Sequence, residues 1–252
     1  MSLWQVSLIA GAGFLAGAMN SMAGGGTFFS FPAMLMAGVP PVVANASNSV
    51  ALWPASLSGA WAYRRELARY KRYLVPMGIV SFLGGIGGGL LLLSTKDATF
   101  SLLIPWLLLF ATVLFAFSGQ LSRWLHGKKA GAPRASPLAL TAHLGVSIYG
   151  GFFGAGMGIL MIASLAMAGH DNVQEINAIK NLLSAVIYSV TITTFILADA
   201  VDWPYTLVMM ATATFGGYTG ASAARNISAL WMRRFIIGVG VVLTLYYFYK
   251  TY

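Results

Sequence analysis

Long apolar runs separated by short polar connections recur along the whole chain. A run of about 18 or more apolar residues is long enough to cross a bilayer as a helix. The pattern therefore predicts an all-α polytopic membrane protein with about eight to ten membrane helices. The expected segments are 3–22, 27–38, 46–63, 73–93, 99–119, 138–157, 159–169, 178–198, 204–223 and 232–250.

The second half of the chain repeats the first at a nearly constant spacing. Asn45-Ala46 recurs as Asn177-Ala178, 132 positions later. The same spacing relates five residues of one apolar run to five of another, Tyr73, Met77, Gly84, Gly85 and Gly88 to Tyr205, Met209, Gly216, Gly217 and Gly220. We therefore expect a first transmembrane repeat at 1–119, a basic linker at 120–137 and a second repeat at 138–252.

Composition and charge place these segments in a membrane and orient them. The chain is 58% hydrophobic and 8% charged, and it contains no cysteine, which excludes disulfides and thiolate redox or metal chemistry. The net charge of +9 could suggest nucleic acid, but basic residues concentrate in connections, with five in 64–72, four in the linker and three in 224–234. Basic loops face the cytoplasm, so we expect no nucleic-acid partner and place these three regions inside.

This orientation makes the two repeats antiparallel. The segment 73–93 runs outward, whereas its counterpart 204–223 runs inward, with the 199–203 loop outside. Inverted repeats are typical of secondary transporters, whose binding site lies between the repeats near the midplane. The sequence thus favours alternating access around a central site. A passive anion channel on the same frame stays open as the alternative, and transport driven by a gradient would separate the two.

Each repeat begins with an interrupted helix that contains a glycine cluster. Irregular backbone at membrane depth requires protein or a water-filled cavity to satisfy its polar groups. A helix that starts just after glycines presents backbone N–H groups and its positive dipole end, which bind anions. We expect substrate contacts from Asn20 and the two clusters, Gly24, Gly25, Gly26 and Thr27 in the first repeat and Gly154, Gly156 and Gly158 in the second. For the glycines at 84–89, close helix packing is the preferred interpretation.

Polar side chains follow each interrupted helix at matching positions. Asn45 and Asn48 correspond to Asn177 and Lys180, and Asn181 follows directly. Converging from two opposed bends, these amides and one ammonium would suit an anion with several oxygens. Snorkelling of Lys180 to the interface is the open alternative.

The remaining ionisable residues give weaker signals. His170, Asp171 and Glu175 share the second polar bend and could relay protons, or could be solvated loop residues. His143 lies near the start of a segment, where an interfacial histidine is the ordinary interpretation. The histidines are too dispersed for a metal centre, and neither glycine cluster carries the serine of an intramembrane protease. We expect neither enzymatic activity nor a cofactor.

The stretch 13–67 resembles the sulfite exporter family TauE/SafE, also called toluene sulfonyl uptake permeases. The shared features are the glycine run, Pro32, the Gly38-Val39-Pro40 step, an Ala-Asn-Ala-Ser-Asn stretch and the basic loop after Tyr63. The resemblance covers essentially the whole chain and implies a multi-pass permease of the bacterial inner membrane for sulfite or an organosulfonate. It implies 154–158 and 177–181 as the second-repeat partners of the first-repeat site. A small anionic substrate and the lipid bilayer are the expected partners. The sequence leaves open whether the protein also forms a homodimer.

Overall fold

The computed structural model describes residues 2–22, 25–62, 67, 70–126, 135–170, 173–223 and 229–252, and these are helical with short connections. The first half contains α1 (Leu3–Met22), α2 (Thr27–Met36), α3 (Pro41–Ala62), α5 (Lys71–Ser94) and α6 (Asp97–His126). The second half contains α7 (Pro137–Phe152), α8 (Met157–Met167), α9 (Val173–Leu197), α10 (Trp203–Ala223) and α11 (Ala229–Thr251). The all-α prediction is confirmed.

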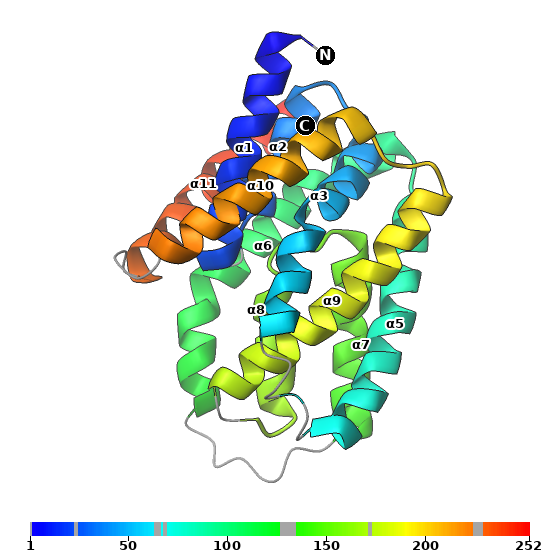
Figure 1. The fold of residues 1–252 in the computed structure, drawn as a ribbon, viewed down its shortest axis with the longest axis vertical. Helices are drawn as coiled ribbons and strands as arrows, with labels where there is room; N and C mark the ends of the chain where they lie inside the picture. Colours follow the sequence, from blue (N-terminus) through cyan, green and yellow to red (C-terminus); the bar gives the residue numbers. More distant parts are fainter. Residues whose placement is uncertain are drawn as a thin grey trace.

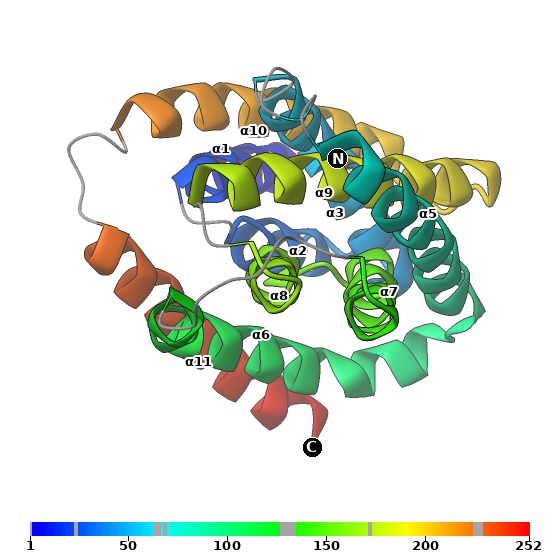
Figure 2. The same cartoon turned by 90° about the horizontal axis from the view of Figure 1, so that it is seen from below.

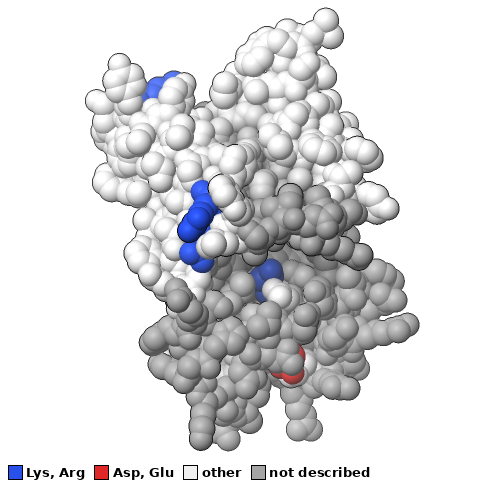
Figure 3. Space-filling model, turned by 90° about the vertical axis from the view of Figure 1, so that its left-hand side faces the viewer, with Lys and Arg blue, Asp and Glu red and all other residues white. Residues whose placement is uncertain are grey.

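Four of these helices are long and apolar enough to cross a membrane, namely α1, α5, α6 and α9. Their outward-facing side chains are largely apolar, and few charged atoms occur on the described part of the lateral face in Figure 3. By contrast, α2 has 10 residues and α8 has 11, which at about 1.5 Å per residue cannot cross a bilayer.

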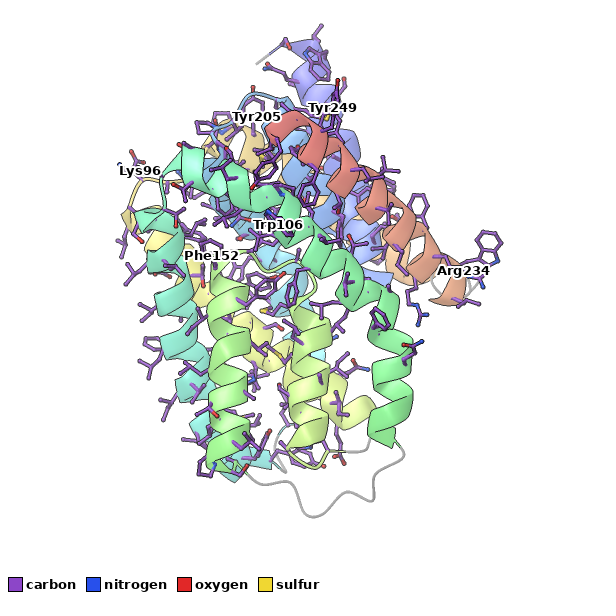
Figure 4. All side chains as sticks on the ribbon, turned by 180° about the vertical axis from the view of Figure 1, so that it is seen from behind. Lys96, Trp106, Phe152, Tyr205, Arg234 and Tyr249 are labelled. Carbon is purple, nitrogen blue, oxygen red and sulfur yellow. The ribbon has the colours of Figure 1, made fainter. Side chains whose placement is uncertain are left out.

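The two short helices form hairpins in opposite halves of the molecule. In Figures 1 and 4, α7 rises from the lower end and α8 returns toward it, whereas α1 and α2 occupy the upper half. Seen from below, α2, α3 and α8 lie inside and α5, α6, α10 and α11 surround them (Figure 2). The starts of α2 and α8 therefore lie in the middle of the molecule.

Helices of one half pack against helices of the other. The most extensive contacts join α1 to α10 and α5 to α7, while α3 packs on α9 and α6 on α11. Glycine permits close approaches at these contacts, because a Cβ on Gly84 or Gly88 would collide with α7 and one on Gly85 would press on the backbone of α9. The packing interpretation is confirmed for these three glycines.

Several helix boundaries differ from the expected ones. α7 ends at Phe152 rather than at residue 157, and α9 begins at Val173 rather than at residue 178. Asn177, Lys180 and Asn181 therefore lie inside a helix and not at a bend. α3 begins at Pro41 rather than at residue 46, so Asn45 and Asn48 lie inside a helix and not at a bend. Proline is favoured in the first turn of a helix, where its missing N–H has no intrahelical partner. α6 continues to His126, into the segment expected as linker, because neither proline nor glycine interrupts residues 120–126.

Candidate functional site

The second glycine cluster forms the tip of the α7–α8 hairpin. Gly154 and Gly156 have φ angles of 79° and 74°, which non-glycine residues adopt only with strain. The Tyr149 hydroxyl donates to the Ala155 carbonyl at 2.6 Å and fixes the tip. The first turn of α8 therefore starts at a buried, glycine-bounded end, as an anion site at a helix N-terminus requires.

Helix α9 presents two polar side chains to this tip. A Cβ built on Gly158 would lie 3.8 Å from Lys180 Cδ, and one on Gly154 would lie 3.2 Å from the Tyr188 hydroxyl. Lys180 is seven residues after the start of α9, or about 10 Å along the helix. Its aliphatic stem thus lies against the first turn of α8.

Lys180 has no acidic partner in the part of the chain that the structure describes. The only ion pair there joins His170 Nδ1 to Glu175 Oε2 at 3.9 Å. An unpaired cation inside a membrane protein is costly unless water or a ligand compensates it. The charge and the α8 N-terminus together favour an anion at this position.

The first glycine cluster is held differently. Gly26 approaches α1 so closely that a Cβ would lie 2.5 Å from the Ala16 carbonyl and 3.1 Å from Asn20 Cβ. One turn later, the buried Ser30 hydroxyl donates to the Gly26 carbonyl at 3.1 Å and contacts Asn48 Oδ1. Gly25 and Thr27 are buried beside them, whereas Gly24 lies outside the described residues.

One hydrogen bond joins the first half to the tip of the second. Asn45 Nδ2 donates to the Phe152 carbonyl, where α7 ends, at 2.8 Å. Its Oδ1 is buried and has no partner among the described residues. Asn45 therefore couples α3 directly to the α7–α8 hairpin.

The expected site residues fall into two groups. In the first group, Ser30 joins Gly26 to Asn48, and Asn20 lies directly beside Gly26. In the second group, Lys180 lies beside Gly158. The described contacts do not bring Asn48 and Lys180 together. Asn177 and Asn181 are half-buried on α9, within one turn of Lys180.

Aromatic rings pack beside Asn45 and the hairpin tip. Phe31 of α2 meets Phe153 edge-on with centroids 5.5 Å apart, and Phe100 of α6 contacts Phe31, Phe152 and Phe153. Phe31, Phe100 and Phe153 are almost completely buried. These rings form an apolar barrier between α2, α6 and the tip.

The ionisable residues of the second polar bend lie elsewhere. The His170 side chain is buried, and its ring packs edge-on against Tyr73 with centroids 4.7 Å apart. Glu175 is half-buried, and Asp171 lies outside the described residues. His143 is not interfacial as expected, because it is fully buried and bonded to Ser81 at 2.8 Å.

An apolar groove of about 430 Å³ opens between α1, α2 and α11, lined by Leu8, Phe29 and Leu243 among others. Its lining contains no charged residue, so it does not resemble an anion site.

Sequence reasoning missed Ser30, Tyr149 and Tyr188. A signal existed for two of them, since Ser30 follows Gly26 by one helical turn and Tyr188 follows Asn181 by seven residues, which places each pair on one helix face. Tyr149 lies in the last turn of α7, before the glycine cluster, and nothing in the sequence indicates its bond to Ala155.

The helices, their apolar exteriors and the buried hairpin tips define a multi-pass α-helical membrane protein. Residues 9–247 match the family described as "Sulfite exporter TauE/SafE", and the chain belongs to this family. It is therefore a membrane transporter of the TauE/SafE type in the bacterial inner membrane.

Similar bacterial proteins span nearly the same length. A "Probable membrane transporter protein" of Haemophilus influenzae is 28% identical over 92% of this chain and 90% of its own length. The "Probable membrane transporter protein YfcA" of Escherichia coli is 26% identical over 96% and 91%, respectively. "Probable membrane transporter protein ORF9" of a Sinorhizobium species is 26% identical over 93% and 88%. No solved structure matches the chain.

Proposed function

We propose that this protein is a secondary transporter that moves a small sulfur-containing oxyanion, sulfite or an organosulfonate, by alternating access between two inverted repeats. The observation that carries the proposal is the position of Lys180, whose stem lies against Gly158 at the start of α8 without an acidic partner among the described residues. An ammonium beside a helix N-terminus attracts anions and not cations.

A binding site on this scaffold would combine three kinds of donor. Backbone N–H groups at the tips around Gly25, Gly26 and Thr27 and around Gly154, Gly156 and Gly158 supply directional hydrogen bonds. Lys180 supplies charge, and the hydroxyl of Tyr188 and the amides of Asn177 and Asn181 supply further donors. Such a set fits an oxyanion with several oxygens, because each oxygen accepts more than one hydrogen bond.

The contacts between helices of the two halves are consistent with a symmetric pair of repeats. If α1, α2, α3, α5 and α6 correspond in order to α7, α8, α9, α10 and α11, the α1–α10 contact corresponds to the α5–α7 contact. The α3–α9 and α6–α11 contacts each correspond to themselves. A two-fold axis between the halves produces this pattern, and an axis in the membrane plane fits it because the two hairpins point in opposite directions. Each hairpin then enters from its own side and reaches the same central region.

Membership of a family described as sulfite exporters supports the substrate class. Sulfite and simple sulfonates share a compact, oxygen-rich anionic head, which is the part that helix N-termini and an ammonium recognise. Asn45 and Asn48 of α3 are the polar side chains of the first repeat that we assign to the same pathway.

Counterflow in proteoliposomes tests the proposal. Vesicles containing purified protein are loaded with unlabelled sulfite and diluted into a trace of [35S]sulfite, with the membrane potential set to zero. A carrier exchanges the tracer inward and produces a transient overshoot, whereas a passive channel gives none. Protein-free vesicles are the control, and competition by methanesulfonate, sulfate and acetate ranks the anions. If neither sulfite nor a sulfonate gave counterflow or competed, the proposed function would be wrong.

A further inference from the structure

Helix α7 buries a histidine against α5, at one of the two most extensive contacts between the halves. His143 has no exposed surface, and its Nε2 lies 2.8 Å from the Oγ of Ser81, which is also fully buried. Along the same contact, a Cβ on Gly84 or Gly88 would collide with α7. The imidazole therefore sits in a dry, closely packed interface.

One ring nitrogen of His143 has no hydrogen-bond partner within the described ranges of the chain. Nδ1 is buried and unpaired among the described residues. A neutral imidazole has one donor and one acceptor, and leaving a buried polar group unpaired costs about 1–3 kcal/mol. An apolar residue of similar size would avoid this cost, so packing alone does not account for a histidine at this position.

We propose that His143 is the proton-binding site that couples substrate movement to the proton gradient. The inference rests on the proposed transport function and adds its coupling ion. In the packed state the ring is neutral, with Ser81 on Nε2. Protonation places a charge in the interface and favours a state in which α5 and α7 separate enough for water to reach the ring.

The neighbouring helices offer no counter-ion for the protonated ring. α5, α8 and α9 pack against α7, and Glu175 of α9 is the only carboxylate in their residue ranges. That carboxylate faces His170 at 3.9 Å. The other ionisable groups on the described parts of α5, α7 and α9 are tyrosines and basic residues, Lys71, Arg72, Tyr73, Tyr149, Lys180 and Tyr188. A charged His143 is therefore favoured only where solvent enters.

Helix α7 links this proton site to the hairpin tip. Nine residues separate His143 from Phe152, which corresponds to about 13 Å along one helix. The Phe152 carbonyl accepts from Asn45, so a shift of α7 on α5 changes the contact between α3 and the tip. Proton binding and anion binding would thus act on the same rigid element, as coupling requires.

The test measures gradient-driven accumulation and exchange separately. Vesicles with wild-type protein receive methanesulfonate as tracer, because its charge does not change with pH. Sulfite is measured in parallel, and the uptake by protein-free vesicles is subtracted from both. We expect a pH gradient to drive accumulation by the wild type. His143→Gln should lose accumulation yet retain counterflow, because glutamine can still bond Ser81 but cannot carry a proton.

Matched variants separate coupling from folding. His126→Gln, at the end of α6, and Ser81→Ala should both keep gradient-driven accumulation, the latter with a shifted pH midpoint. If His143→Gln accumulated tracer like the wild type, or if His170→Gln alone abolished accumulation, the inference would be overturned. If the wild type showed counterflow without any response to the gradient, the inference would fail while the transport function stood. Without wild-type counterflow, the function itself would fail.

A spectroscopic measurement covers the case in which His143→Gln does not fold. The chain has three histidines, so His126→Gln/His170→Gln leaves His143 as the only imidazole. Ring ¹⁵N shifts of this protein should show protonation as the pH is lowered, with a midpoint that moves when methanesulfonate or sulfite binds. A ring that stayed neutral throughout, with and without anion, would contradict the inference.

Discussion

Replacing Lys180 with methionine tests the charge on which the proposed site depends. Methionine keeps an unbranched apolar stem of similar length against Gly158 but removes the ammonium. A hydrogen bond to a charged group contributes about 1.5–3 kcal/mol, which corresponds to a loss of about 10- to 150-fold in anion affinity. Burial keeps salt from screening the interaction, so the loss should persist at high ionic strength.

Although Lys180→Met should weaken anion binding, it should stabilise the protein that has no anion bound. A charge held deep in a membrane protein without a partner costs at least about 2.5–3.5 kcal/mol unless it is hydrated, and Lys180 has no described acidic partner. Lys180→Met should therefore raise the melting temperature without anion while it reduces the increase that sulfite produces. A higher melting temperature without anion, together with weaker stabilisation by sulfite, distinguishes a cation that binds the anion from one that only stabilises the fold.

The assay is thermal unfolding in detergent across a series of sulfite concentrations, with affinity checked by calorimetry. Lys250→Met serves as the control, because Lys250 is exposed in the last turn of α11. Unchanged affinity in Lys180→Met, or a lower melting temperature of the empty variant, would refute the reasoning and return Lys180 to an interfacial role.

Three further predictions concern the tip, the packing and the topology. Gly154→Ala should destabilise the protein by about 1–2 kcal/mol, because Gly154 has a left-handed φ. Gly145→Ala should stabilise helix α7 slightly, because the added Cβ meets nothing within 4 Å. Equal melting temperatures of the two variants would contradict this prediction. Gly88→Ala should lower the melting temperature more than Gly145→Ala raises it, because its Cβ would collide with the α7 backbone, and an unchanged value would show that the helices can separate freely. The chain has no cysteine, so Ala198→Cys should react with an impermeant thiol reagent from outside the cell and Ala135→Cys only after the membrane is opened; the reverse pattern would invert the topology.

Much of the helical architecture could be predicted from apolar periodicity and glycine alone. The boundaries of α1, α5 and α10 agree with the expected segments within two residues. The short helices α2 and α8 were also expected, because glycine clusters and polar steps bound them. Local sequence suffices for these features, since a helix ends where its backbone is interrupted.

Contacts between distant residues could not be predicted in this way. The Asn45–Asn48 stretch reads as a polar bend, yet it is helical because its amides bond to Phe152 and Ser30 on other elements. The partner of His143 is Ser81, 62 residues away. A polar residue in an apolar segment indicates that its side chain makes a buried contact, but the sequence does not identify the residue that it contacts.

The interface between the halves combines tight packing with few directional bonds. Glycines bring the backbones of α5 and α7 together, and the described bonds across the halves include Trp53 to Ser189 at 3.0 Å and Thr191 to the Gly85 carbonyl at 3.1 Å. Each such bond contributes only about 0.5–1.5 kcal/mol net. A ligand shifts two states by its difference in affinity for them, and a single charged hydrogen bond reaches about 1.5–3 kcal/mol. In the proposed mechanism, therefore, one charged hydrogen bond to the anion offsets the loss of about two of these bonds, and the halves can rock only if most of their helix packing is kept or exchanged.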